Sequence, residues 1–243
     1  MKSEPLKICI LENGLTPADL IDEFGSYPAM IERWISPFLP GAAFTYISPV
    51  RGEALPNLEA FDGYILSGSR YSTYEKAPWM LSLIDFLQAL KEKRIPVFGI
   101  CFGHQIMADA YGGQTTKAKN GWGVGAQVYE YVNGAPPKAA ASFIFHQDQV
   151  TTLPPSASCI GGSSHCTNGV LAYDFPAISV QFHPEFTTAY IQALATKFRG
   201  TLLPEEISSK ALDSIESLEV DNSQIAHWAA SFFRKHAYSI PVS

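Results

Sequence analysis

The feature that most constrains the fold is an alternation of short apolar runs with amphipathic helical patterns over the first 111 residues. Each apolar run ends near turn residues, and in the segments between them apolar residues recur at spacings of three and four. We expect strands at 7–11, 43–47, 63–66 and 96–100 and helices at 28–38, 79–93 and 102–111. Strands joined through helices need crossover connections, so the pattern predicts an α/β fold. We expect three layers, with a mostly parallel sheet flanked by helices.

The alternation stops in the middle of the chain. Residues 121–181 are richer in Gly, Pro, Ser and Thr and show short strand patterns without a long helical period, at 125–132, 158–161, 170–173 and 177–182. These patterns predict antiparallel strands added to the sheet. Helical patterns return at 187–198, 204–218 and 223–235. Since no repeat or linker interrupts the chain, we expect a single domain over 1–243, with its core at about 6–198 and C-terminal helices at 204–236.

Charge and cysteine content narrow the classes of partner and compartment. The chain carries 17 Lys+Arg against 23 Asp+Glu, a net charge of -6, and no basic run, which argues against nucleic acid as a partner. The first apolar run ends at Asn13-Gly14, too early for a secretion signal or a membrane span. We therefore expect a cytoplasmic protein without membrane association, in which the four cysteines are free thiols.

Residues 96–105 carry the strongest chemical signal. A buried strand runs into a helix through Gly99-Ile100-Cys101-Phe102-Gly103, the pattern of a nucleophile elbow. The central residue of such a turn has a strained backbone, and we expect its side chain to stand exposed at the carboxyl edge of the sheet. The helix N-terminus favours a thiolate at Cys101 and leaves the amide of Phe102 free for an oxyanion. Taken alone, these residues fit a buried structural cysteine between packing glycines equally well.

A thiolate nucleophile needs a base, and the base needs a group that orients it. In 178–186 an apolar strand ends at His183, and Glu185 lies two residues further along. Pro184 stops the strand and turns the chain, so both side chains can point the same way. A lone histidine at a strand end is more often structural. Because the cysteine elbow and the His183–Glu185 pattern are both scarce, their occurrence in one chain is more easily explained by a shared catalytic role than by chance.

The segments GICFGHQ at 99–105 and QFHPEF at 181–186 resemble the two most diagnostic motifs of the class I glutamine amidotransferases. The resemblance covers about residues 6–198 and implies a flavodoxin-like fold with Cys101 as nucleophile, His183 as general base and acid, and Glu185 as the carboxylate that holds the imidazole. The chain is similar to GMP-synthase-like amidotransferase domains and to γ-glutamyl peptidases. EFGSYPAMIER at 23–33 and GWGVG at 121–125 look more like the free-standing members.

Further site residues are implied by the same resemblance. The turn that helps to form the oxyanion hole in this family usually reads Ser-Gly-Gly, where this chain has Ser67-Gly68-Ser69. The resemblance implies an oxyanion hole made by the amides of Ser69 and Phe102. Because serine replaces the second glycine, fewer backbone angles are accessible at Ser69. Gln105 matches the residue that contacts the glutamine substrate. Residues 145–148 resemble the stretch whose backbone holds the amino-acid end of that substrate, which adds three substrate-binding residues: His146, Gln147 and Asp148.

Several other residues receive structural interpretations. Cys159, His165 and Cys166 lack a second pair of ligands at metal-binding spacing, so we expect no metal. Cys9 lies in the first apolar run and belongs to the core. His104 is expected to form a structural hydrogen bond from its helix.

The expected reaction is cysteine-dependent hydrolysis of the γ-amide of glutamine or a small γ-glutamyl compound through a γ-glutamyl thioester, with no cofactor. Only about 45 residues follow residue 198, and the chain has no Gly-x-x-x-x-Gly-Lys phosphate loop. Three interpretations stay open. The protein is a free-standing hydrolase, a glutaminase subunit that supplies ammonia to a separate synthetase subunit, or a non-catalytic binding protein of the same fold. The intact Cys101, His183 and Glu185 argue against the last.

Overall fold

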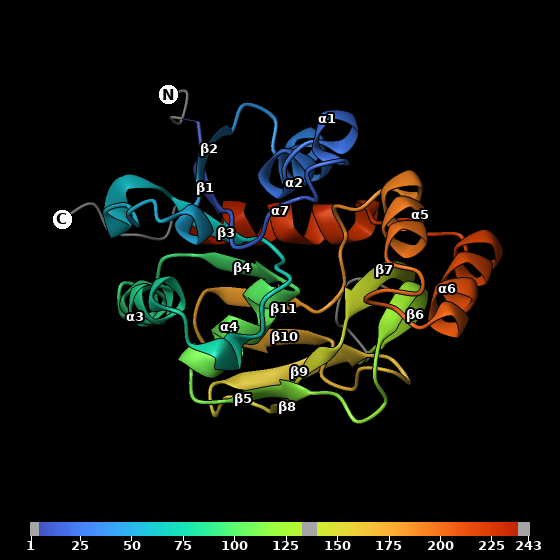
Figure 1. Cartoon of the computed structure of the whole chain (residues 1–243). Coiled ribbons are helices and arrows are strands. Elements are labelled where there is room, and N and C mark those ends of the chain that lie inside the picture. Colours follow the sequence, from blue (N-terminus) through green and yellow to red (C-terminus); the bar gives the residue numbers. More distant parts are fainter. Residues whose placement is uncertain (1–4, 133–139, 238–243) are drawn as a thin grey trace.

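A nine-stranded sheet forms the centre of the computed structural model, which describes residues 5–132 and 140–237 (Figure 1). Its strand order is β2-β1-β3-β4-β11-β10-β9-β6-β7. The first five strands in this order run parallel: β2 (Ala43–Ile47), β1 (Lys7–Leu11), β3 (Gly63–Leu66), β4 (Val97–Ile100) and β11 (Ala177–Val180). Their carboxyl ends meet at one edge of the sheet, which brings Leu66, Ile100 and Val180 into adjacent positions.

The other strands of the sheet pair antiparallel. They are β10 (Val170–Tyr173), β9 (Ala157–Gly162), β6 (Gly123–Tyr131) and β7 (Ala140–His146). Two polar strands, β5 (Gln114–Lys117) and β8 (Asp148–Thr152), form a separate ribbon. An isolated bridge between Phe143 and His183 brings β7 next to the end of β11, so the antiparallel section forms one wall beside the parallel edge.

Helices cover both faces of the parallel section (Figure 1). On one face, α2 (Tyr27–Ile35) and α7 (Ser223–Ala237) bury residues such as Ile31 and Phe233 against β1 and β4. On the other face, α3 (Pro78–Glu92) and α4 (Phe102–Ala110) bury Leu87 and Ile106. Two more helices, α5 (Thr188–Lys197) and α6 (Glu205–Ser217), lie beside β6, and a short helix, α1 (Ile21–Phe24), precedes α2. Within 5–132 and 140–237, no helix has the length and apolarity needed to cross a bilayer.

The expected α/β architecture, with a mostly parallel sheet between helices and an added antiparallel section, is confirmed. The helix expected over 28–38 ends at Ile35 because Pro37 follows, and Ser36–Phe38 continues as a 3-10 turn, η1. The strands β5, β7 and β8 were not expected. The first and last of these consist largely of Thr, Gln, Asp and Lys and bury little, so they lack the apolar signal on which strand prediction depends.

Candidate active site

Cys101 lies at the sharp corner between β4 and α4. Its backbone has φ 51° and ψ -102°, in the region that non-glycine residues rarely adopt. Gly103 allows α4 to start directly behind β3, since a Cβ at this position would lie 2.6 Å from the carbonyl oxygen of Leu66. The corner therefore has the strained strand-to-helix geometry that the Gly-x-Cys-x-Gly pattern predicts.

The expectation that the Cys101 side chain stands exposed is wrong. The residue is only 4% exposed and belongs to the core on the α2 and α7 face. The turn after β3 covers it, because a Cβ added to Gly68 would lie 3.6 Å from the Cβ of Cys101 and 2.6 Å from Cε1 of His183. Cys101 and His183 thus both pack beside the glycine turn at the carboxyl edge of the sheet.

His183 and Glu185 form a buried pair. His183 Nδ1 lies 2.8 Å from Glu185 Oε1, and both side chains are almost inaccessible. The His183 amide donates to the carbonyl of Phe143 at 2.8 Å, which ties the histidine to β7. Because Nδ1 faces the carboxylate, Nε2 is the ring nitrogen that remains for the Cys101 sulfur. The expected order of nucleophile, base and orienting carboxylate thus requires Nε2 of His183 to serve Cys101 while Nδ1 is held by Glu185.

The electrostatics of the pair favour a protonated imidazole. Burial alone would lower the pKa of His183, but the Glu185 carboxylate and the Cys101 sulfur outweigh it and raise the pKa to about 10. A protonated imidazole can donate to a leaving nitrogen, which is the role of a general acid.

Three aromatic rings that were not among the predicted site residues form a cluster on one face of the His183 imidazole and limit its movement. The ring of Phe186 stacks on His183 at a centroid distance of 3.9 Å and an interplanar angle of 9°. Tyr27, at the start of α2, stacks behind Phe186 at 6.0 Å, and Tyr190 packs edge-on against Phe186 at 4.7 Å. The sequence could have indicated two of these rings, since Phe186 ends the QFHPEF motif and Tyr27 lies within residues 23–33.

The turn after β3 is anchored from β1. The amide of Asn13 donates to Ser67 Oγ at 2.9 Å, and Asn13 Nδ2 donates to the Ser67 carbonyl at 3.3 Å. Gly14 packs against this turn, since its Cβ would lie 2.6 Å from Cα of Ser69. On the other side of Cys101, Phe102 is the first residue of α4, so its N–H has no acceptor within the helix. The turn that contains Ser69 and the N-terminus of α4 that contains Phe102 thus both adjoin Cys101.

Three of the four expected substrate-binding residues meet at one backbone carbonyl. Gln105 Nε2 donates to the carbonyl oxygen of Asp148 at 2.8 Å, and His146 Nδ1 lies 3.2 Å from the same oxygen. Gln147 is engaged elsewhere in the chain, where its carbonyl accepts from the amide of Ala118 at 2.9 Å. The Asp148 carboxylate accepts from Ser72 Oγ at 2.5 Å, which ties the β8 start to the loop after β3.

The remaining candidates have structural environments. His104 Nδ1 lies 2.8 Å from Ser179 Oγ, and burial lowers the pKa of His104 to about 3, so its ring is neutral. Cys9 and Cys166 are fully buried, and burial raises the pKa of each to about 12. In the part of the chain that the structure describes, no three His, Cys, Asp or Glu side chains are grouped so as to hold a metal ion.

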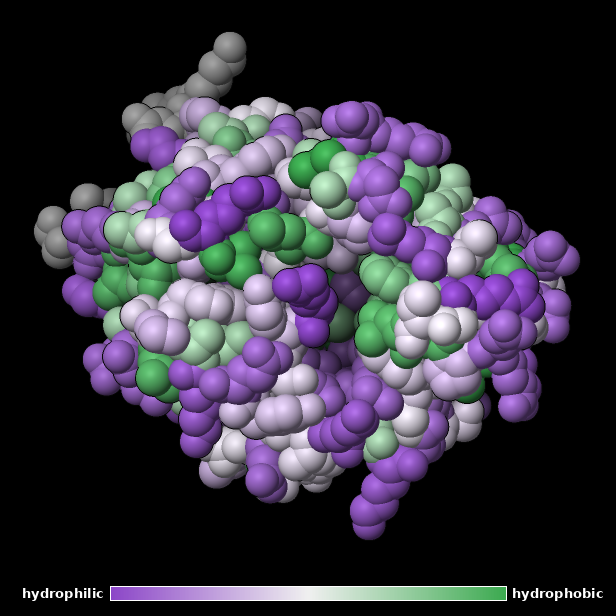
Figure 2. Space-filling view, in the orientation of Figure 1, coloured by the Kyte–Doolittle hydropathy of each residue, from purple (hydrophilic) through white to green (hydrophobic). Residues whose placement is uncertain are grey.

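The molecular surface is hollowed beside this constellation. In the orientation of Figure 1, Figure 2 shows a recess with hydrophilic and hydrophobic walls between the carboxyl end of β4 and strands β6 and β7. The recess gives a small molecule a place next to the buried elbow.

The model of the family "Glutamine amidotransferase class-I" matches residues 42–197. The chain belongs to the class I glutamine amidotransferase family. Among its relatives, γ-glutamyl peptidase 5 of Arabidopsis thaliana is 28% identical over 179 residues, which cover 69% of this chain and 71% of that protein. The GMP synthase of Wolinella succinogenes is 32% identical over 190 residues, which cover 73% of this chain and 35% of that protein.

A solved glutamine amidotransferase from Thermotoga maritima has the same fold as this class I amidotransferase chain. Its TM-score is 0.75 at 21% identity, and the alignment covers 98% of this chain and all of that one. The resemblance inferred from the two motifs, to γ-glutamyl peptidases and to GMP-synthase-type domains, is therefore confirmed at the level of the family.

Proposed function

We propose that the protein hydrolyses the γ-amide of glutamine or of a small γ-glutamyl compound, with Cys101 as nucleophile. The observation that carries the proposal is an elbow cysteine that packs against the same glycine turn as a histidine whose Nδ1 lies 2.8 Å from a buried carboxylate. A positively charged imidazole beside the sulfur is the usual way in which proteins activate a cysteine.

The proposed reaction has two steps. The Cys101 sulfur attacks the γ-carbonyl carbon, and the amides of Ser69 and Phe102 stabilise the resulting oxyanion. The carbon–nitrogen bond breaks as His183 gives its proton to the leaving nitrogen, which departs as ammonia or an amine and leaves a γ-glutamyl thioester. His183 then takes a proton from water, the water oxygen attacks the thioester carbon, and glutamate leaves with the thiol restored. Glu185 keeps the imidazole oriented in both steps.

A release assay on the purified chain tests this proposal. We expect glutamate and an amine from γ-glutamyl dipeptides or glutamine, and none from the α-linked glutamyl isomers. A site shaped for the free α-amino and α-carboxylate groups of the glutamyl part rejects compounds that lack them. Comparable cleavage of the α-linked isomers would contradict the assignment of the glutamyl pocket to Gln105 and residues 146–148.

The second candidate function is that of a glutaminase subunit. It is favoured by the match to a GMP synthase, in which the similar region is about a third of the whole protein. A subunit of this kind supplies ammonia to a separate synthetase and needs that partner for full activity. Activity on glutamine alone that rises when a cellular extract is added would select this function over peptide hydrolysis.

A further inference from the structure

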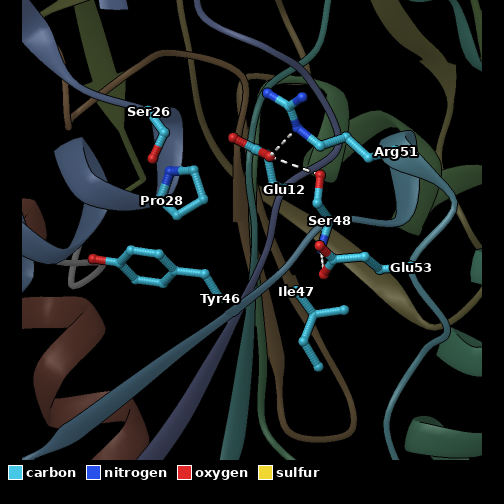
Figure 3. A pocket seen from close by; sticks show the side chains of 8 residues that line it. All are labelled: Glu12, Ser26, Pro28, Tyr46, Ile47, Ser48, Arg51 and Glu53. Carbon is cyan, nitrogen blue, oxygen red and sulfur yellow. Dashed lines mark hydrogen bonds and ion pairs between the residues drawn. The ribbon is translucent and has the colours of Figure 1, made fainter. Parts of the chain in front are cut away.

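A second cavity lies at the carboxyl edge of the sheet, at the ends of β1 and β2 (Figure 3). Its volume is about 230 Å³, and no residue that we place in the catalytic centre lines it. Its walls come from Glu12 after β1, from Tyr46 and the residues that follow it, and from the N-terminus of α2. This volume lies below the roughly 300–1,000 Å³ of pockets for drug-sized ligands, so the cavity suits only a smaller molecule.

The Glu12 carboxylate has one oxygen engaged and one oxygen facing the cavity. Oε2 accepts from Ser48 Oγ at 2.7 Å and lies 3.5 Å from Arg51 Nε. The other oxygen is turned toward Ser26 and Pro28 on the opposite wall (Figure 3). Glu12 is only 7% exposed, whereas the Arg51 side chain is 52% exposed and shares its charge with water. A buried carboxylate in this position is therefore compensated only in part.

Negative charge exceeds positive charge around the cavity. Glu53 lines it and uses Oε2 to accept from the amide of Ser48 at 2.8 Å. The hydroxyl of Tyr46, a lining residue, donates to the carboxylate of Glu32, which lies outside the lining. Two carboxylates, those of Glu12 and Glu53, thus line the cavity with one guanidinium, that of Arg51, so the cavity favours a cation.

The remaining walls indicate what kind of cation fits. Pro28, Ile47 and the ring of Tyr46 offer apolar surface to a short carbon chain. A metal ion would meet only the Glu12 and Glu53 carboxylates, and the described residues contain no group of three potential metal-ligating side chains. An ammonium has three N–H donors, and the acceptors among the lining residues include the free oxygen of Glu12, the Glu53 carboxylate and the hydroxyl of Ser26, which also accepts from the amide of Ala29 at 3.3 Å.

We propose that this cavity binds a primary ammonium group carried on a short aliphatic chain. Such a group has two sources, a free amine or the amine tail of a γ-glutamyl substrate, and the second rests on the proposed function. The location fits both. Ser26 and Pro28 line the cavity, and Tyr27 between them stacks on Phe186, which covers His183. The rings of Tyr27 and Phe186 therefore lie between this cavity and the His183 imidazole.

Calorimetry on the whole chain tests the ammonium site directly, with propylammonium as the probe and uncharged 1-propanol as its isostere. We expect wild type to bind propylammonium and not 1-propanol, and Glu12→Gln to weaken binding at least tenfold. Glu59→Gln is the matched control, because Glu59 is an exposed carboxylate paired with Lys93 away from the cavity. Since Glu12 also holds Ser48, Glu53→Gln is measured in parallel, with thermal unfolding as the check that each variant is folded. Equal binding by wild type and both folded variants, no binding by wild type, or calcium binding instead of the amine would overturn the proposal.

Kinetics then separate the two sources. The substrates are the γ-glutamyl conjugate of 1,3-diaminopropane and γ-glutamyl propylamide, which differ in the terminal ammonium. If the cavity holds the tail, Glu12→Gln raises KM at least tenfold for the diamine conjugate only. If it holds a free amine, calorimetric binding persists while both KM values stay unchanged. Absence of turnover with these conjugates, with γ-glutamyl dipeptides and with glutamine would refute the proposed hydrolysis, whereas the calorimetric result would still decide whether the cavity binds an ammonium.

Discussion

Replacing Gly68 by alanine tests whether the turn after β3 sets the position of His183. An added Cβ would lie 2.6 Å from His183 Cε1, and its next contacts, at 3.5 Å and 3.6 Å, are ordinary ones. Gly68 is absent from the glycines with positive φ, so alanine strains no backbone there. Any effect of the substitution must therefore come through the imidazole.

The size of the effect follows from the contacts around the ring. To restore a normal contact of 3.4 Å, His183 and Cβ must separate by about 0.8 Å. Movement of the ring is opposed by the 2.8 Å bond to Glu185 and by the stacked Phe186 at 3.9 Å. Overpacking of this kind costs about 1–3 kcal/mol of unfolding free energy. A misplacement of about 1 Å in a catalytic group lowers the rate about 100-fold.

A double-mutant cycle in urea denaturation is the decisive assay. Gly68→Ala should cost about 1–3 kcal/mol in wild type and close to nothing in a His183→Ala background, because the obstructing ring is gone. In the single variant we also expect kcat to fall about 100-fold while KM changes little. The same loss of stability in both backgrounds would refute the idea that Gly68 is there to make room for His183.

Three further predictions concern the same site. A diazo-ketone analogue of glutamine should label Cys101 and spare the half-exposed Cys159, as read by peptide mass spectrometry, and Cys101→Ala should abolish turnover. His183→Ala should lower kcat more than Glu185→Gln, because the amide still orients the imidazole while alanine removes the proton donor; equal rates for wild type and His183→Ala would remove the triad argument. The pKa of His183 rises from 6.5 to about 10 on folding, so its protonation stabilises the native state fully below pH 6.5, and this stabilisation disappears as the pH approaches 10. Urea unfolding from pH 6 to pH 10 should therefore show a stability advantage of wild type over Glu185→Gln that shrinks as the pH rises.

Much of the fold could be predicted from the sequence because its periodic patterns are local. The run Lys7–Leu11 and the helix Pro78–Glu92 bury side chains at the spacing that their own residues display. The strand Ala140–His146 was missed, although it supplies a wall of the site. Its pairing with Gly123–Tyr131 joins neighbouring segments, but its place at the site comes from the bridge between Phe143 and His183, which are far apart in the chain.

The elbow and the chain order of Cys101, His183 and Glu185 could be read from local residues alone, because turn glycines and a strand-ending proline act over a few bonds. The packed fold was needed to show that Cys101 is covered, that the ring of Tyr27 backs Phe186, and that Glu12 faces a cavity. Each of these depends on contacts between segments far apart in the chain, whose approach is set by how strands and helices pack. Local residue patterns carry the chemistry of a site, while burial, orientation and charge balance arise when the packed segments exclude water from one another.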